Sequence, residues 1–154
     1  MGSLPFRSLL FASIAVLLIF ANVEEARAKR MTRCEVALQL QRAGISRTFI
    51  GHWLCLIETV SNLRTDLVVG PQRASSYSYG IFQITSNGWC ARGRRGGICN
   101  MRCEDLANDN ISDDIQCAKQ IYNLQGFRAW DAWTRSCKNK PPSQLPNFAN
   151  CRRR

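Results

Sequence analysis

The stretch Tyr79-Gly80-Ile81-Phe82-Gln83-Ile84-Thr85-Ser86 lies near the centre of the chain and is followed shortly by Trp89-Cys90. Residues 68–84 contain short β-like runs, such as residues 79–84, which are punctuated by Gly70-Pro71, a Ser/Tyr-rich stretch and Gly80, and this predicts short β-strands joined by turns. A polar, glycine-rich loop comes next and carries Cys90, Cys99 and Cys103. We therefore expect a small β-rich segment in the middle of the chain.

Helical patterns flank this β-rich segment on both sides. Before it, residues 34–44 predict one helix and residues 52–61 predict a second, largely buried helix. After it, a third helix is expected from an N-cap at Ser112 to a terminal glycine at Gly126, and a fourth over residues 130–137. Helices on both sides of a β-rich insertion predict the α+β fold class.

Residues 1–28 have the features of a cleaved signal peptide. Arg7 precedes an apolar run that is too short to span a bilayer comfortably, and Ala26-Arg27-Ala28 provides a small-x-small cleavage pattern. The mature chain would begin at Lys29, and residues 29–154 are expected to form a single domain. An uncleaved N-terminal signal anchor is the alternative. Cleavage at this site predicts a secreted, extracellular protein. We expect no membrane-spanning segment in the mature chain, because no other segment is apolar enough.

All eight cysteines lie in the predicted mature chain: Cys34, Cys55, Cys90, Cys99, Cys103, Cys117, Cys137 and Cys151. An even number of cysteines in a secreted chain predicts four disulfides, although on the order of 100 connectivities are possible. A zinc site would need Cys-x-x-Cys pairs or clustered histidines, and the chain has a single histidine, His52. We therefore expect disulfides and no zinc.

The chain is strongly basic, with 21 Lys and Arg, 11 Asp and Glu, and a net charge of +10. This charge favours attraction to anionic polymers such as bacterial envelopes, sulfated glycans and nucleic acids. Specific nucleic-acid binding is not expected, because basic and aromatic residues do not interleave as RNA-binding motifs require. The clusters Arg92-Gly93-Arg94-Arg95 and Arg152-Arg153-Arg154 are candidate contacts with anionic surfaces. Solvated loops and a frayed tail explain them equally well.

Several motifs in order resemble the c-type lysozyme and α-lactalbumin family (glycoside hydrolase family 22 type) over nearly all of residues 29–154. Residues 51–61 resemble its second helix and residues 79–90 its β-sheet motif, while 113–119 and 129–133 resemble its third helix and its tryptophan-rich segment. The resemblance implies a mainly helical lobe and a small antiparallel β lobe. The short loop between Cys34 and Cys55 is more similar to the insect branch of the family.

The resemblance also implies how the cysteines pair: Cys34–Cys151, Cys55–Cys137, Cys90–Cys103 and Cys99–Cys117. The first two disulfides would tie the helical parts together. The last two would join the β lobe to the third helix.

Lysozymes of this family, the type example of retaining glycoside cleavage, use one carboxyl group as an acid and another as nucleophile or stabiliser. The resemblance places these groups at Val60 and Ser78, so both carboxylates are missing. Glu58 would point about 200° away from Val60 around a helix, which predicts a structural role. Ser78 is not expected to act as a nucleophile, because His52 is not placed as its base. The sequence therefore predicts a catalytically inactive protein.

The resemblance implies four contacts with substrate sugars: Gln83, Trp89, Ala129 and Trp130. Indole rings stack on the apolar faces of N-acetyl sugars. Gly88 and Thr85 replace an aromatic residue and an asparagine that are usual in the family, which should weaken binding. Alternatively, Trp89, Trp130 and Trp133 are remnants of the core and the cleft wall. We expect weak recognition of N-acetylglucosamine polymers or peptidoglycan, in defence or reproduction, without hydrolysis.

Residues 105–114 have the spacing of the calcium loop of α-lactalbumin and calcium-binding lysozymes. The resemblance implies carbonyl ligands at Asp105 and Asn110, and side-chain ligands at Asn108, Asp113 and Asp114. Alternatively, Asp113 and Asp114 bind no metal and simply cap the start of the third helix, where they interact with the helix dipole. Asn110-Ile111-Ser112 is also an N-glycosylation sequon, so Asn110 is a candidate glycan attachment site.

Three other functions stay open at this point. One is a lysozyme-type hydrolase with residual bacteriolytic activity, which would need a carboxylate pair about 5–9.5 Å apart. Another is a cationic antibacterial protein that acts without hydrolysis and loses potency as salt is added. The last, by analogy with α-lactalbumin, is a regulatory partner of another enzyme. A monomer is expected in each case.

Overall fold

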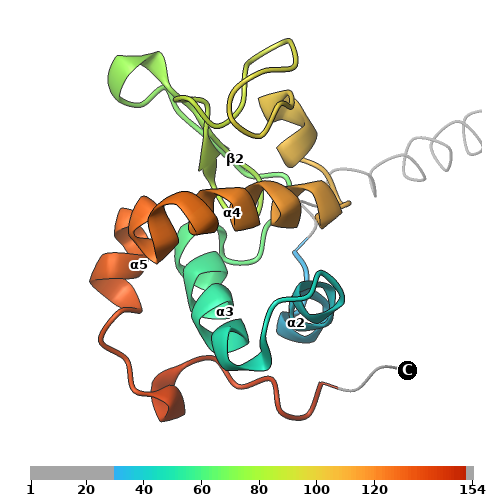
Figure 1. Ribbon diagram of the computed structural model, residues 1–154, viewed down its shortest axis with the longest axis vertical. Coiled ribbons are helices and arrows are strands. Elements are labelled where there is room, and N and C mark those ends of the chain that lie inside the picture. Colours follow the sequence, from blue (N-terminus) through green and yellow to red (C-terminus); the bar gives the residue numbers. More distant parts are fainter. Residues whose placement is uncertain (1–29, 152–154) are drawn as a thin grey trace, which may run out of the picture.

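The computed structural model describes residues 30–151, so the predicted signal peptide and the Arg152-Arg153-Arg154 cluster lie outside the described residues. The α-helices of this part of the chain are α2 (Arg33–Arg42), α3 (Arg47–Ser61), α4 (Ser112–Gln125) and α5 (Asp131–Ser136). The strands are β1 (Val68–Val69), β2 (Ser78–Tyr79) and β3 (Ile84–Thr85). Helix α4 crosses the middle of the molecule, between the β-rich lobe and helices α2 and α3 (Figure 1). The predicted α+β fold is confirmed.

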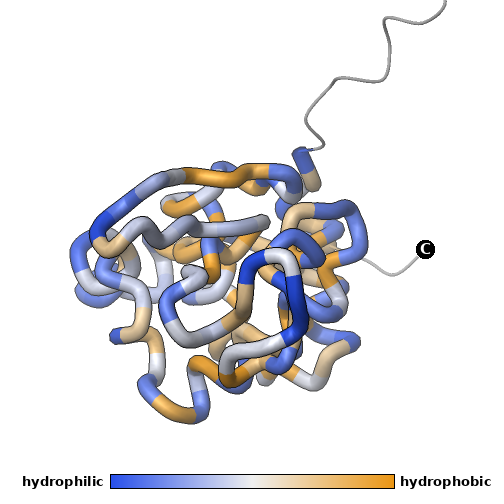
Figure 2. The backbone as a smooth tube through the Cα atoms, turned by 90° about the horizontal axis from the view of Figure 1, so that it is seen from above, coloured by the Kyte–Doolittle hydropathy of each residue, from blue (hydrophilic) through white to orange (hydrophobic). Residues whose placement is uncertain are grey.

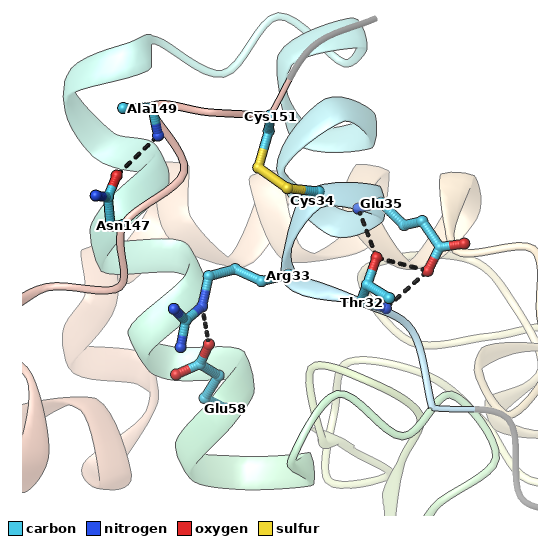
Figure 3. The surroundings of a disulfide bond; sticks show 8 residues. All are labelled: Thr32, Arg33, Cys34, Glu35, Glu58, Asn147, Ala149 and Cys151. Atoms are coloured by element: carbon cyan, nitrogen blue, oxygen red, sulfur yellow. Dashed lines mark hydrogen bonds and ion pairs between the residues drawn. A yellow bond between two sulfur atoms is a disulfide. The ribbon is translucent and has the colours of Figure 1, made fainter. Parts of the chain in front are cut away.

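Helix α2 begins with a capping box. The Thr32 hydroxyl accepts a hydrogen bond from the Glu35 N–H at 3.2 Å, and the Glu35 carboxylate accepts from the Thr32 N–H at 2.7 Å (Figure 3). Each interaction satisfies a backbone donor that the first turn of a helix leaves unpaired. The sequence Thr32-Arg33-Cys34-Glu35 thus fixes where the helical lobe begins.

Two helix starts differ from the prediction. Helix α3 begins five residues before His52, at Arg47, because the fully buried Ile50 extends its apolar face toward the N-terminus. Helix α4 begins at Ser112, but the N-cap position is Ile111, which has no capping side chain, and the Asn110 side-chain oxygen accepts the Ser112 N–H at 3.2 Å. The Ser112 hydroxyl instead bonds the Asn110 side-chain oxygen, which turns it away from the helix N–H groups.

The β lobe contains a short antiparallel sheet in the order β1-β2-β3, with Val69 paired to Ser78 and Ser78 to Thr85. The run Tyr79–Ile84 does not form one strand, because a turn over residues 80–83 separates β2 from β3. Gly80 makes this turn possible. Its φ is +69°, and a Cβ atom there would lie 1.7 Å from the Leu106 carbonyl oxygen.

An aromatic cluster fills the centre of the helical lobe. The Trp53 ring lies 4.8 Å from that of Phe127, 5.4 Å from Tyr122 and 5.8 Å from Trp130, measured between centroids. Leu54, Leu56 and Ile57 of α3 are fully buried around it. Strongly hydrophilic stretches occupy loops at the periphery of the molecule (Figure 2). The core therefore lies where α3, α4 and the β2–β3 turn meet.

Four disulfides form, with the pairing that the family resemblance implied. Cys34–Cys151 joins α2 to the C-terminal segment (Figure 3), and Cys55–Cys137 joins α3 to the end of α5. Cys99–Cys117 joins the β lobe to α4, as expected. Cys90–Cys103 instead closes the β lobe on itself, because both cysteines precede α4. Among residues 30–151, no helix is long and apolar enough to cross a membrane.

Candidate active site

The two positions that the resemblance assigns to catalysis lie on different lobes. Val60, in the last turn of α3, is partly buried and packs against the core. Ser78, on β2, is 5% exposed, and its hydroxyl accepts a hydrogen bond from the Gln72 amide at 3.1 Å. General acid catalysis needs a group that exchanges a proton near the working pH, and neither side chain does so. This pair cannot perform the two-carboxylate reaction.

His52 does not supply a base for Ser78. The imidazole packs against Phe127 and Trp133, with ring centroids 5.9 and 5.7 Å apart. Its Nδ1 is buried and has no hydrogen-bond partner within the described part of the chain. Burial lowers the pKa of His52 below its ordinary value. The histidine is therefore a partly buried side chain packed against the aromatic cluster of the helical lobe.

Glu58 has the structural role that its place on the helix predicts. Its carboxylate accepts a hydrogen bond from Arg33 Nε at 2.6 Å and so links α3 to α2 (Figure 3). The pair lines a groove of about 420 Å³ together with residues of the C-terminal segment, such as Lys140 and Gln144. No β-lobe residue lines this groove, so Glu58 and Ser78 do not face each other across it.

Most other acidic side chains of residues 30–151 hold structural contacts. Glu35 caps α2, Asp66 pairs with Arg64, Asp105 pairs with Arg102, Glu104 accepts from the Gly93 N–H, and Asp109 accepts from the Thr65 hydroxyl. Asp131 is different. It is exposed in the first turn of α5, immediately after Trp130. Asp131 was not predicted as a site residue, because the family's two carboxylate positions lie elsewhere in the chain.

The predicted sugar-contact residues (Gln83, Trp89, Ala129 and Trp130) differ in how much surface they offer. Trp130 is only 7% exposed, and its indole N–H donates to the Phe82 carbonyl at 3.0 Å. The Gln83 amide nitrogen donates to the Leu67 and Gly80 carbonyls at 2.9 and 2.8 Å. Trp89 and Ala129 are partly exposed beside the core. Trp89 is thus the aromatic ring of this set that remains most open to a ligand.

The predicted calcium loop contains two adjacent carboxylates with buried, unsatisfied oxygens. Both oxygens of Asp114 and one of Asp113 are buried and accept no hydrogen bond from any described residue. Burial, and next the charge of Asp113, raises the pKa of Asp114 to about 9. Calcium binds clusters of hard oxygen ligands, so these orphaned carboxylate oxygens fit it.

The rest of the implied ligand set fits calcium less well. The Asn108 side-chain oxygen accepts from the Asn110 N–H at 2.7 Å, and its amide nitrogen bonds the Asp105 carbonyl. Within residues 30–151, no three or more His, Cys, Asp or Glu side chains gather as a metal site. A calcium ion would therefore be held by Asp113 and Asp114 together with carbonyl oxygens of this loop. Asn110 itself is exposed, and its glycosylation stays a prediction.

Comparison with known proteins identifies the family. The sequence model that describes the C-type lysozyme/alpha-lactalbumin family matches residues 29–151 of this chain. The chain belongs to this family. The lysozyme of Galleria mellonella is 39% identical over 124 residues, covering 80% of this chain and 100% of that protein. Sperm acrosome-associated protein 5 of Bos taurus is 40% identical over 131 residues, covering 81% of each chain.

A solved lysozyme structure gives the same result for the fold. The crystal structure of lysozyme from Equus asinus matches with a TM-score of 0.71 and 35% identity, covering 80% of this chain and 99% of that one. In this lysozyme-family chain, the fold is therefore retained around two positions, Val60 and Ser78, that carry no carboxyl group.

Proposed function

We propose that this lysozyme-family protein is secreted and binds N-acetylglucosamine polymers or peptidoglycan without hydrolysing them. One observation carries the proposal. The two positions that hold catalytic carboxyl groups in the family are Val60 and Ser78 here, and neither side chain exchanges a proton near neutral pH. Support for binding comes from Trp89 and Ala129, which stay partly exposed beside the same core. A fold without its catalytic groups does not retain the activity, but a surface for sugars does not need those groups.

Residual hydrolysis is the second candidate, and Asp131 is the observation that favours it. Asp131 is exposed and directly follows Trp130, the last of the predicted sugar-contact residues. It is therefore the acidic residue nearest to them in the sequence. A single acid without a second carboxylate would give at most slow cleavage, because loss of one catalytic group typically costs several orders of magnitude in rate.

The decisive experiment compares lysis of bacterial cell walls by oxidised residues 29–154 with lysis by the Val60→Glu, Ser78→Asp variant. We expect an inert natural chain and measurable activity in the double variant. A carboxyl group at 60 would lie against an apolar core, which raises its pKa as a catalytic acid requires. A carboxylate at 78 would accept the hydrogen bond that Gln72 now donates to Ser78.

Two control variants show whether another acidic residue is responsible for any activity that is measured. Glu58→Gln removes a carboxylate from the other face of α3 and should change nothing in this assay. Asp131→Asn should also change nothing. Turnover by the natural chain that disappears in Asp131→Asn would replace our proposal with residual hydrolysis.

Sugar binding is tested directly by titrating the natural chain with chitooligosaccharides and following backbone amide shifts by NMR. We expect millimolar to high-micromolar affinity, with shifts around Trp89 and Ala129. Trp89→Ala should weaken binding about fivefold, since a stacking contact of an aromatic ring contributes on the order of 1 kcal/mol. A chain that shows no shifts with any oligosaccharide would contradict the proposal.

Relatives named lysozyme and a relative named sperm acrosome-associated protein 5 support defence and reproduction as the two settings for such a protein.

A cationic antibacterial action is tested by bacterial killing. Killing that survives Trp89→Ala but falls steeply with added salt would favour it.

We also propose that calcium stabilises the loop over residues 105–114. In the absence of metal, a folded pKa of about 9 for Asp114 exceeds that of an unfolded aspartate, so the contribution of Asp114 to stability is fully present in acid and is lost as pH rises from about 4 toward 9. At pH 7, millimolar calcium should raise Tm relative to a chelator. Asp114→Asn should remove both effects, while Asp109→Asn, which alters a side chain bonded to Thr65, should keep them. An unchanged Tm with calcium would exclude the site.

A further inference from the structure

A second pocket lies on the β lobe and contains none of the residues discussed above as catalytic or sugar-binding. It has a volume of about 340 Å³ and opens between residues 74–76 and residues 91–94. Its polar lining consists of hydroxyl, amide and guanidinium groups: Ser75, Ser76, Ser86, Asn87, Arg92 and Arg94. No acidic side chain lines it. We refer to it as the arginine pocket.

Arg92 is held in place by an aromatic ring rather than by a carboxylate. Its guanidinium carbon lies 4.2 Å from the centroid of the Tyr77 ring, a cation–π contact that orders the side chain and leaves its charge uncompensated. Burial raises the pKa of Tyr79, so this neighbouring phenol stays neutral and does not offset the charge of Arg92.

Of the two acidic groups closest to this loop, Glu104 bonds the backbone between Arg92 and Arg94, and Asp105 is paired with another arginine. The Glu104 carboxylate accepts the Gly93 N–H at 3.1 and 3.2 Å, and Asp105 pairs with Arg102 at 2.6 Å. The ion pairs found within residues 30–151 do not include Arg92 or Arg94. Over residues 67–103 the sequence has five arginines and no acidic residue. Two guanidinium groups therefore line a pocket whose wall contains no acidic side chain, and Glu104, bonded to the Gly93 N–H between them, offsets only part of their charge.

Of the three serine hydroxyls in the lining, Ser76 donates to the Arg73 carbonyl at 2.8 Å, which leaves Ser75 and Ser86 as donors for a ligand. The Ser86 oxygen accepts from the Tyr77 N–H at 3.0 Å, which leaves the Ser86 hydroxyl proton for a ligand. Ala74 and Ser75 both adopt left-handed backbone conformations, with φ of +55° and +54°. Such conformations cost about 1–2 kcal/mol per non-glycine residue and concentrate at binding sites. They present Ser75 at the rim of the pocket.

We infer that the arginine pocket binds an oxyanion group of an anionic polysaccharide. Guanidinium groups bind sulfate, phosphate and carboxylate through paired N–H donors, and serine hydroxyls complete such a site. A volume near the lower end of the range for ligand sites, about 300–1,000 Å³, suits one charged sugar unit. The inference does not depend on the proposed sugar-contact residues, since none of them lines this pocket.

The test measures binding of a heparin hexasaccharide to oxidised residues 29–154 by calorimetry at 150 mM NaCl. Arg92→Gln combined with Arg94→Gln should weaken binding at least tenfold. The matched control, Arg42→Gln combined with Arg135→Gln, removes the same charge from exposed helix positions and should weaken it less than threefold. Equal losses in the two variants would mean attraction by net charge alone and would overturn the inference.

Further arms identify the anion and separate this site from the other proposal. Arg92→Lys keeps the charge without the paired donors, so an intermediate loss of about threefold to fivefold is expected, whereas full retention of affinity would contradict a built site. Hyaluronan, which carries only carboxylates, and a teichoic acid, which carries phosphates, show which oxyanion is preferred. Trp89→Ala should leave heparin binding intact. A loss there would mean a single shared site.

Discussion

The helical lobe and the β lobe are stabilised by different means. Around α3 the helical lobe buries a continuous apolar core, and its two disulfides join residues 117 and 82 positions apart. In the β lobe the strands have two residues each, Val68 and Val69 are 46% and 42% exposed, and disulfide partners are 13 and 18 positions apart. Apart from the β2–β3 turn, whose Ile81 and Phe82 reach the shared core, the β lobe therefore depends on turns and on cross-links between residues close in sequence, which leaves its surface open to a charged, arginine-rich sequence.

The largest effect is expected from removing disulfides one lobe at a time. In the chain-entropy description, loss of Cys55–Cys137 costs about 4.5 kcal/mol and loss of Cys99–Cys117 about 3 kcal/mol. Paired Cys→Ala variants measured by urea denaturation test this order. Hydrogen exchange adds a regional measurement, because only the second variant should accelerate exchange mainly in residues 64–106. Uniform acceleration in both variants would contradict a difference between the lobes.

A smaller effect is expected from a methyl group at the turn between β2 and β3. Gly80→Ala would place a Cβ atom against the Leu106 carbonyl, so overpacking adds to the cost of a left-handed alanine, for a total of about 3 kcal/mol. Gly44→Ala is the matched control in the helical lobe. Gly44 has a φ of +81°, and no atom lies within 4 Å of the place that its methyl group would take, so about 1 kcal/mol is expected there. Equal Tm losses would show that the contact with Leu106 relaxes freely.

The two lobes also differ in how well their structure could be predicted from the sequence. Apolar periodicity and stop signals located the four helices, and the end of α4 at Gly126 agrees with the prediction. The start of α3 was placed too late, because Arg47, Thr48 and Phe49 interrupt the apolar pattern. In the β lobe, the strand pattern over 79–84 concealed a turn, because alternation does not reveal a left-handed residue such as Gln83. Local patterns suffice for the lobe with a regular core and fail in the lobe built from turns.

The candidate sites show the same division. The missing carboxylates follow from aligning motifs with a family and need no coordinates. The full burial of Asp114 and the partial burial of Asp113 depend on how α4 faces the β lobe, which two adjacent aspartates do not reveal. The arginine pocket likewise needs tertiary structure, since Arg92 meets Tyr77 across 15 positions of sequence and a disulfide-closed loop.

The smallest expected effect concerns the ion pair between α2 and α3. Arg33 and Glu58 side chains are 46% and 27% exposed, and pairs so accessible to water contribute about 0.2–1 kcal/mol. Glu58→Gln should therefore lower the free energy of unfolding by less than 1 kcal/mol, and less still at high salt. Asp66→Asn, which breaks the comparably exposed Arg64 pair, is the control and should behave alike. A loss above about 2 kcal/mol for Glu58→Gln alone would mean that this pair, beside Cys34–Cys151 (Figure 3), holds α2 in place as much as the apolar core does.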